Sequence, residues 1–170
     1  LTGRPGFGKT TVVVRLAERL RSYRLAGFCT EEVRRGGQRT GFRIRTFSGR
    51  QGMLAEVGRR GGPRVGRYGV DVAGFESIVL PELTRRAELV IIDEIGKMEC
   101  FSGRFVEVVR GLLDGPVRVL ATVAASGGGF IAEVKARPDV RLLTVTADNR
   151  DALPRQLADW AAGLETGQAG

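Results

Sequence analysis

The sequence predicts an α/β fold with a mostly parallel central sheet and an added β-hairpin, and three observations support this prediction. Apolar runs typical of strands alternate with helix-like segments through most of the 170 residues. A glycine-rich loop at residues 3–10 leads directly into a helical pattern. A continuous apolar run at residues 89–93 ends in an acid, which is typical of a strand buried on both faces of a parallel sheet. We find no repeat or linker, so we expect one domain over residues 1–170.

The first half of the chain alternates a helix, a hairpin and a second helix. Apolar side chains at helical spacing predict a helix over residues 9–22. Two extended runs on either side of Gly36 and Gly37 predict a β-hairpin. Residues 49–70 hold many Gly and Arg with little periodicity, and they predict a long loop with at most one short strand. Residues 72–87 have a helical pattern, which Pro81 is expected to kink or break.

The second half of the chain predicts three strands and three helices in alternation. The strands are expected at residues 89–93, 117–123 and 140–146, and the helices at residues 102–115, 127–139 and 147–164. Gly115 is the expected end of the first of these helices. Asp148 or Asn149 is the expected N-cap of the last one, with Pro154 in its early turns.

Residues 3–10 read Gly-Arg-Pro-Gly-Phe-Gly-Lys-Thr, the spacing of a phosphate-binding loop. Successive backbone N–H groups in such a turn cradle an anion at a helix N-terminus. Lys9 is expected to reach the β- and γ-phosphates, the Thr10 hydroxyl to hold Mg²⁺, and Thr11 to lie near the α-phosphate. The predicted nucleotide contacts in this loop are Gly3, Arg4, Pro5, Gly6, Phe7, Gly8, Lys9, Thr10 and Thr11.

A second pattern, LVIIDEIGKME, begins at the apolar run of residues 89–93. Asp93 ends the expected strand, at the edge where open α/β sheets bind ligands, and can hold Mg²⁺ through water. Glu94 can orient and deprotonate an attacking water, although a solvated residue at a strand end is the alternative. Metal ligand and base side by side favour hydrolysis. We predict that Glu94 is catalytic, that Asp93 binds the metal, and that residues Asp93, Glu94, Ile95 and Gly96 contact the nucleotide.

Further polar residues could complete the site. Thr122 ends the strand expected beside Asp93, where its hydroxyl could touch the γ-phosphate or the water; a Thr that only favours β-structure is an equal alternative. Asn149 and Arg150 follow the last expected strand, where they would meet the base. Charge on the transferred phosphoryl group invites an arginine. The candidates for that arginine are Arg34, Arg39, Arg67 and Arg150, each of which alone is more typical of a solvated surface.

Composition excludes several kinds of site and compartment. The chain has no histidine, so a Ser-His-Asp triad, a histidine-ligated zinc and histidine acid–base catalysis are excluded. Cys29 and Cys100 match no metal spacing and are expected to be reduced thiols. No apolar run is long enough to span a membrane and no secretory leader is present. We therefore expect a cytoplasmic protein without a membrane partner.

The charge balance bears on the partners. The net charge is +8, which is typical of nucleic-acid binding, but only Lys9, Lys97 and Lys135 are lysines and the other 24 basic residues are Arg. These arginines are scattered without an RNA-binding aromatic signature. A nucleic-acid partner is therefore disfavoured but left open by the charge, nucleoside triphosphates are the expected ligands, and a monomer is favoured over an oligomer.

The front of the chain departs from the usual pattern. A buried central strand normally leads into a phosphate-binding loop, but only Leu1 and Thr2 precede it here, and there is no initial Met. Two residues cannot supply the apolar side chains and ladder hydrogen bonds of a central strand. We therefore expect that the first strand is truncated in this sequence.

Four further segments extend the pattern beyond the loop: GFCTEEVRRGGQRTGFRIRTFSG (27–49), VGRYGVDVAGFE (65–76), IIDEIGKMEC (91–100) and DNRDALP (148–154). In this order they resemble the small nucleoside-triphosphatase family of thermophilic bacteria and archaea, which has a human member, the cancer-related nucleoside-triphosphatase. The resemblance covers nearly the whole chain. The chain departs from this family in having no Lys or Arg between Thr122 and the following helix, where relatives often carry a basic residue.

The resemblance implies a three-layer, RecA-like P-loop NTPase fold and slow, Mg²⁺-dependent hydrolysis of ATP, GTP, CTP, UTP and TTP to the diphosphate. It also implies nucleotide binding by residues 3–10 and 89–96, with Glu94 as the catalytic carboxylate. Two alternatives stay open. One is a nucleotide or small-molecule kinase, and the other is a nucleotide-gated module that binds RNA or a protein partner.

Overall fold

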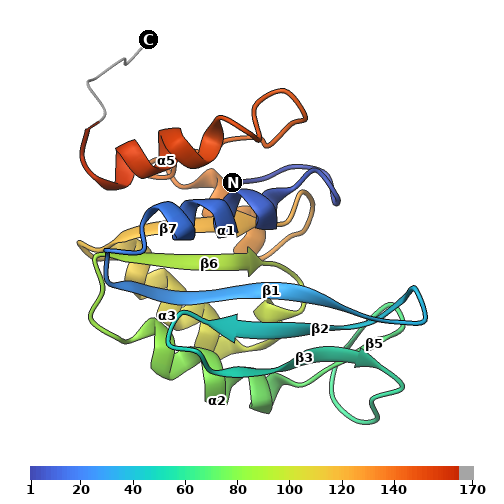
Figure 1. Ribbon diagram of the computed structural model, residues 1–170. Helices are drawn as coiled ribbons and strands as arrows, with labels where there is room; N and C mark the ends of the chain where they lie inside the picture. The colour runs from blue at the N-terminus through green and yellow to red at the C-terminus, as the bar shows by residue number, and fades with distance from the viewer. Residues whose placement is uncertain (165–170) are drawn as a thin grey trace.

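The computed structural model describes residues 1–164 and has a seven-stranded sheet as its middle layer (Figure 1). The strands are β1 (Leu25–Arg35), β2 (Gln38–Thr46), β3 (Gln51–Val57), β4 (Arg64–Val65), β5 (Tyr68–Val70), β6 (Leu89–Ile95) and β7 (Arg118–Val123). Their order in the sheet is β4-β5-β3-β2-β1-β6-β7. The sheet is mixed, because β1, β6 and β7 are parallel to one another while the pairs from β1 through β2, β3 and β5 to β4 are antiparallel.

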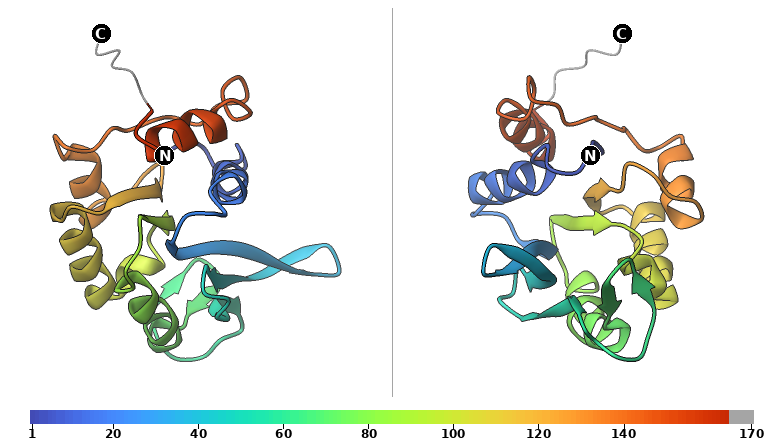
Figure 2. Two further views of the ribbon diagram at one scale, coloured as in Figure 1. Left: turned by 60° about the vertical axis from the view of Figure 1, so that its left-hand side comes forward. Right: turned by 90° about the vertical axis from the view of Figure 1, so that its right-hand side faces the viewer.

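Helices cover both faces of the sheet and complete the three predicted layers (Figure 2). The helices are α1 (Lys9–Arg19), α2 (Val72–Leu83), α3 (Gly103–Asp114), α4 (Phe130–Ala136) and α5 (Leu153–Ala161), with a 3-10 turn, η1, at Glu99–Phe101. Helices α1 and α5 pack on one face, and α2, α3 and α4 pack on the other. Among residues 1–164, no helix is long and apolar enough to cross a membrane.

Successive side chains along a strand point to opposite faces of the sheet, so a separate hydrophobic core forms on each face. In β6, Leu89 and Ile91 belong to the core under α1 and α5, while Val90 and Ile92 belong to the core under α2 and α3. All four side chains are at most 1% exposed. A strand that is buried on both faces needs a continuous apolar run. The apolar run at residues 89–93 is therefore explained by this burial, as predicted.

Three phenylalanines join two helices to the sheet. Phe28 of β1, Phe75 of α2 and Phe105 of α3 pack edge to face, with ring centroids 5.2 to 6.1 Å apart. Each such pair contributes about 0.5–1.5 kcal/mol beyond the area that it buries. Phe28 and Phe75 are therefore core residues, and these contacts hold α2 and α3 against β1.

The parallel register of β1 and β6 places the carboxyl ends of these strands together. Leu25 lies opposite Leu89 and Phe28 opposite Ile92. The two strands approach so closely at Gly27 that a Cβ there would lie 1.8 Å from the carbonyl oxygen of Ile91. Beyond this contact β1 continues into the predicted hairpin with β2, which projects from the body of the molecule (Figure 2).

Two sequence predictions about the sheet were wrong. Residues 49–70 were expected to be mainly loop, but they form β3, β4 and β5, because pairing with β2 gives β3 its backbone partners despite the weak apolar pattern. Residues 140–146 were expected to be a strand, but within residues 1–164 their ladder contact is limited to the bridge between Thr2 and Thr144. A strand needs a neighbour along its length, and in this described part of the chain the strand-like backbone hydrogen bonds to the segment come from Thr2 alone, at Leu143 and Val145.

The last helix also starts later than predicted. It begins at Leu153 with Ala152 as its N-cap, instead of near Asp148 or Asn149. The Asn149 side chain is used elsewhere, because its amide bonds the backbone of Thr144 and Thr146 and closes the preceding turn.

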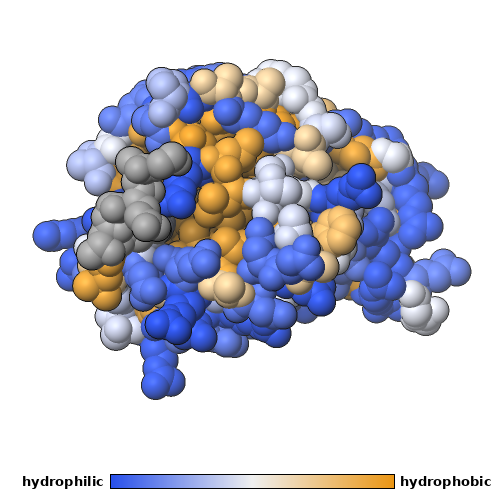
Figure 3. Space-filling view, turned by 90° about the horizontal axis from the view of Figure 1, so that it is seen from above, coloured by the Kyte–Doolittle hydropathy of each residue, from blue (hydrophilic) through white to orange (hydrophobic). Residues whose placement is uncertain are grey.

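Leu1 and Thr2 lie in a strand position between β7 and residues 143–145. Leu1 bonds to Ala121 and Val123 of β7, and Thr2 bonds to Leu143 and Val145 on the other side, over 2.6 to 2.9 Å. Alongside the rest of β7, a groove of about 500 Å³ is lined mainly by apolar side chains of β7, α5 and residues 139–144. Figure 3 shows apolar surface between polar margins on the side of the molecule that carries α5.

Candidate active site

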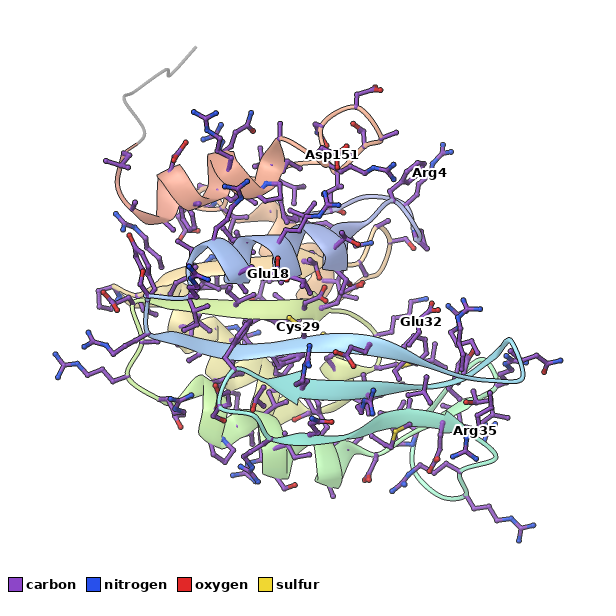
Figure 4. The ribbon with its side chains drawn as sticks, in the orientation of Figure 1. Arg4, Glu18, Cys29, Glu32, Arg35 and Asp151 are labelled. Carbon is purple, nitrogen blue, oxygen red and sulfur yellow. The ribbon has the colours of Figure 1, made fainter. Side chains whose placement is uncertain are left out.

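The glycine-rich loop joins Thr2 to α1, and its backbone has the shape of an anion cradle. Gly6 and Gly8 have φ angles of 83° and 93°, which residues with side chains rarely adopt. Gly3 has no room for a side chain, because a Cβ would lie 2.8 Å from the carbonyl oxygen of Val145. Arg4, Pro5 and Gly6 form the exposed tip, and Figure 4 shows Arg4 extending away from the sheet. The loop therefore brings its main chain to the N-terminus of α1.

Lys9 folds back along this loop. Its Nζ donates a hydrogen bond to the carbonyl oxygen of Gly3 over 3.1 Å. Burial raises the pKa of both Asp93 and Glu94, and the positive charge of Lys9 opposes that rise. The ammonium group thus lies near the loop and the two carboxylates, while its contact with the β- and γ-phosphates stays a prediction.

Asp93 is almost fully buried at the carboxyl end of β6. It is 1% exposed, and its Oδ1 accepts a hydrogen bond of 2.6 Å from the Thr122 hydroxyl on β7. Burial raises the pKa of Asp93, and hydrogen bonding by Thr122 and then Thr10 opposes that rise. Within residues 1–164, its Oδ2 has no hydrogen-bond partner of ordinary geometry.

The unpartnered Oδ2 suits a cation. A buried polar atom without a partner costs about 1–3 kcal/mol, and a cation beside it would remove that cost. The described part of the chain has no cluster of three or more His, Cys, Asp or Glu side chains that could hold a metal ion by themselves. Mg²⁺ commonly takes one carboxylate together with phosphate oxygens and water. One acid, Asp93, with the Thr10 hydroxyl therefore fits Mg²⁺ bound together with a phosphate ligand.

Glu94 is half-buried next to Asp93. Burial raises the pKa of its carboxyl, the charge of Lys9 lowers it, Asp93 raises it, and Lys135 lowers it. The two residues that follow, Ile95 and Gly96, are buried, and Ile95 is the last residue of the strand. Glu94 is thus partly open to solvent at the edge of the sheet where the phosphate loop lies (Figure 1).

The side chains of Thr122 and Asn149 both form hydrogen bonds with neighbouring protein groups in this structure. Thr122 is fully buried and its hydroxyl donates to Asp93, so a direct contact with a phosphate stays a prediction. The Asn149 side chain holds the turn of residues 144–149, as described above, which brings Arg150 to the loop. Arg150 Cδ lies 3.8 Å from the position of a Cβ on Gly8. Arg150 therefore packs against the loop, while its contact with a base stays a prediction.

The other three candidate arginines form one cluster on the hairpin and β5. Arg34 and Arg39 both bond Glu32, and Arg39 and Arg67 both donate to the Tyr68 hydroxyl. Figure 4 shows Glu32 on β1, well below Arg4 in that view. These arginines form their hydrogen bonds within the cluster. In the described structure, no hydrogen bond or ion pair joins them to the phosphate loop.

The structure adds three residues that the sequence analysis did not single out. Thr30 donates to the carbonyl oxygen of Asp93 over 2.6 Å. Lys135 of α4 donates to the carbonyl oxygen of Ala125 over 2.8 Å. Its charge also lowers the pKa of Glu94, against the larger effect of burial. A basic residue therefore lies near Glu94, although none lies between Thr122 and α4. Glu99 is buried directly after β6. The signal for Lys135 was its rarity, as one of three lysines in an arginine-rich chain.

Comparison with known proteins gives consistent similarities over nearly the full length. A family model described as NTPase matches residues 1–158. The nucleoside-triphosphatase THEP1 of Thermofilum pendens is 47% identical over 172 residues, which cover 96% of this chain and 94% of that protein. The cancer-related nucleoside-triphosphatase of Homo sapiens is 42% identical over 172 residues, covering 90% of each.

Solved structures agree with the fold. The crystal structure of THEP1 from the hyperthermophile Aquifex aeolicus superposes with a TM-score of 0.85 at 38% identity, covering 94% of this chain and 96% of that chain. The solution structure of a human cancer-related nucleoside triphosphatase gives a TM-score of 0.82 at 38% identity and covers 97% of each. The likeness therefore includes both sequence and three-dimensional architecture.

Proposed function

The chain belongs to the NTPase family and is a nucleoside-triphosphatase, and from that premise we propose that it hydrolyses the triphosphate at the site built by residues 3–11, Asp93 and Glu94. The observation that carries the proposal is the buried Asp93 with its unpartnered Oδ2 beside the phosphate loop, directly followed by a partly exposed Glu94. This arrangement offers a metal ligand and a base within two consecutive residues.

Each residue has a distinct task in this proposal. The backbone N–H groups of residues 3–8 and the Lys9 ammonium bind the phosphates, and Lys9 offsets the charge that develops on the γ-phosphoryl group. Glu94 orients the attacking water and accepts its proton. Thr122 holds Asp93 in place through the 2.6 Å hydrogen bond. Arg150, which packs beside Gly8, contributes a further positive charge next to the nucleotide.

Mg²⁺ is the proposed cofactor. Thr10 and Asp93 would hold it, and when bound it neutralises negative charge on the β- and γ-phosphates. The support for this proposal is the donor set itself, namely one hydroxyl and one carboxylate oxygen without a partner, which leaves the remaining positions to phosphate and water.

We also propose broad base specificity among ATP, GTP, CTP, UTP and TTP. The proposed contacts are mainly with phosphates, and the amide of Asn149, which the sequence placed near the base, is engaged with the backbone of residues 144 and 146. A site that reads a base through hydrogen bonds can discriminate by roughly 10⁴-fold, and these residues offer no such constellation.

The test is phosphate release from the five triphosphates, with Mg²⁺ and with EDTA. We expect kcat/KM values within about 10-fold of each other with Mg²⁺, and loss of hydrolysis in EDTA. A preference of roughly 1,000-fold for one base would contradict broad specificity, and hydrolysis that is unchanged in EDTA would contradict the metal proposal. Labelled γ-phosphate that appears on a nucleoside or monophosphate, instead of in free phosphate, would indicate a kinase.

A further inference from the structure

Glu99 is a second buried carboxyl group beside the site, and the proposed reaction gives it no task. It begins η1, directly after β6, and is 5% exposed. Acidic side chains are seldom buried to this degree unless another group pairs with them. The charges that act on Glu99 are those of Glu94 and Asp93, which are both negative. Its burial is therefore not explained by an ion pair with these neighbours.

Glu94 and Glu99 meet at Gly96. A Cβ built on Gly96 would lie 2.9 Å from Oε2 of Glu99 and 3.4 Å from Oε1 of Glu94. Both carboxyl groups therefore border the space that a side chain at position 96 would take. The backbone of Glu99 and then that of Gly96 favour the charged form of the Glu99 carboxyl and so oppose part of the rise in its pKa, and the N–H of Cys100 donates to the carbonyl oxygen of Gly96 over 3.0 Å. The bond from Cys100 to Gly96 closes the turn between them, which brings Glu99 back towards Gly96.

The environment keeps Glu99 uncharged near neutral pH. Burial is the main cause that raises the pKa of Glu99, to about 8, and Glu94 and Asp93 raise it further. Nearby, Glu76 of α2 and Arg104 of α3 form an ion pair of 3.5 Å with each other, and Glu76 also accepts a hydrogen bond from Ser102, the N-cap of α3. A neutral Glu99 can lie beside an ionised Glu94 without repulsion between like charges.

We propose that Glu99 is a positioning residue for hydrolysis: its carboxyl, packed at Gly96, keeps the Glu94 carboxylate in the orientation in which it reaches the water at the phosphate loop. The inference rests on the proposed role of Glu94 as the base. Removing the Glu99 side chain opens space beside Glu94, which can then turn away from the loop. A misplacement of about 1 Å can cost on the order of 100-fold in rate. The loop residues that bind phosphate are left in place.

The first test compares Glu99→Ala with Glu99→Gln. We expect Glu99→Ala to lower kcat by about 10- to 100-fold with an unchanged dissociation constant for a fluorescent ATP analogue. Glu99→Gln keeps the shape of the neutral acid and a hydrogen-bond donor, so its kcat should stay within about 3-fold of the wild type. Wild-type kcat in Glu99→Ala would overturn the proposal. So would a loss of nucleotide affinity that equals the loss in kcat, because Glu99 would then support the whole loop.

A double-mutant cycle tests whether Glu99 affects the rate of hydrolysis through Glu94 or in another way. In the Glu94→Gln background, Glu99→Ala should leave the residual rate unchanged, because no base remains to be positioned. A further loss of about 10-fold in that background would overturn the proposal. Full activity of Glu94→Gln alone would instead overturn the proposed function, so the two failures are distinguishable.

A methyl group placed between the two carboxyls gives an independent probe. Gly96 does not have a positive φ, so Gly96→Ala adds crowding without backbone strain. We expect a fall in kcat of about the size seen in Glu99→Ala. The matched control is Gly111→Ala on α3, where a Cβ meets nothing within 4 Å; it should keep wild-type kcat and slightly raise the melting temperature. Wild-type kcat in Gly96→Ala would overturn the packing argument.

Discussion

Thr122 donates a hydrogen bond of 2.6 Å to Oδ1 of Asp93, and this bond joins β7 to β6 at the centre of the site. Both side chains are buried, at 0% and 1% exposure. The bond holds one carboxylate oxygen and leaves Oδ2 without a partner. A buried polar atom without a hydrogen-bond partner of ordinary geometry carries a free-energy cost, and this supports the proposal that a cation binds at Oδ2.

Asp93→Asn tests this relationship with a nearly isosteric side chain. The variant should lose the increase in nucleotide affinity that Mg²⁺ gives, because a neutral amide is a poor magnesium ligand. Its melting temperature should be equal to or above that of the wild type, because a buried carboxylate no longer has to be desolvated. Nucleotide titrations with and without Mg²⁺, together with a thermal melt, measure both effects. An undiminished Mg²⁺ effect on affinity would contradict the assignment.

Lys9→Ala tests the phosphate cradle. Loss of a charged hydrogen bond to phosphate costs about 1.5–3 kcal/mol, so we expect nucleotide affinity to fall by roughly 10- to 100-fold. Isothermal titration with ATP measures this change. Arg19→Ala, an exposed cation in the last turn of the same helix, is the control and should bind ATP normally. Equal affinities in both variants would count against the cradle.

The stability of the protein should depend on pH through Glu99. The pKa of Glu99 is about 8 in the folded state against an ordinary value of 4.5. Between these values the folded state keeps a proton that the unfolded state has released. The Glu99 contribution is therefore fully present below pH 4.5 and is lost as the pH rises towards 8, by at most about 1.4 kcal/mol per pH unit.

Glu99→Gln removes this titration. Urea unfolding of both proteins at pH 5, 6.5 and 8 should show the variant becoming more stable relative to the wild type as the pH rises. Because all other titrating groups are shared, their contributions cancel in the difference. A difference that does not change with pH would contradict the raised pKa of Glu99.

The apolar groove beside β7 predicts a gain in stability from an added strand. About five apolar, β-favouring residues placed ahead of Leu1 would extend into this groove and pair with β7. Each Val or Ile side chain that becomes buried contributes up to roughly 1.5–3 kcal/mol, so the melting temperature should rise by several degrees. A Gly-Ser extension of equal length is the control. Equal melting temperatures for the two extensions would contradict the expected placement.

The sequence predicts the fold correctly where the local pattern of residues is sufficient to determine the secondary structure. The apolar run before Asp93 is typical of a strand buried on both faces and forms β6, and Gly36 and Gly37 mark the hairpin turn. Residues 49–70 were misassigned because β3 owes its state to pairing with β2, which is a non-local contact. Residues 140–146 have a strand pattern, but within the described residues they have a backbone neighbour only around Thr144.

In the candidate site too, features that depend on local sequence could be predicted, whereas features that depend on non-local contacts could not. Glycine spacing encodes the loop, because positive φ at Gly6 and Gly8 is a local requirement. The bond from Thr122 to Asp93 depends on which strands are adjacent; the sequence placed Thr122 on a strand beside Asp93 but did not predict this bond. Glu99 was missed because an acid in a surface-like stretch carries no sign that the 3-10 turn buries it.

The most direct test of the account is Glu94→Gln, measured for both binding and single-turnover phosphate release with Mg²⁺–ATP. Gln keeps the shape of the side chain but cannot accept the proton of the attacking water. We predict wild-type affinity for ATP and a rate of phosphate release that is lower by about 10²- to 10⁴-fold. Phosphate release at the wild-type rate in this variant would contradict the central claim that Glu94 prepares the water for attack.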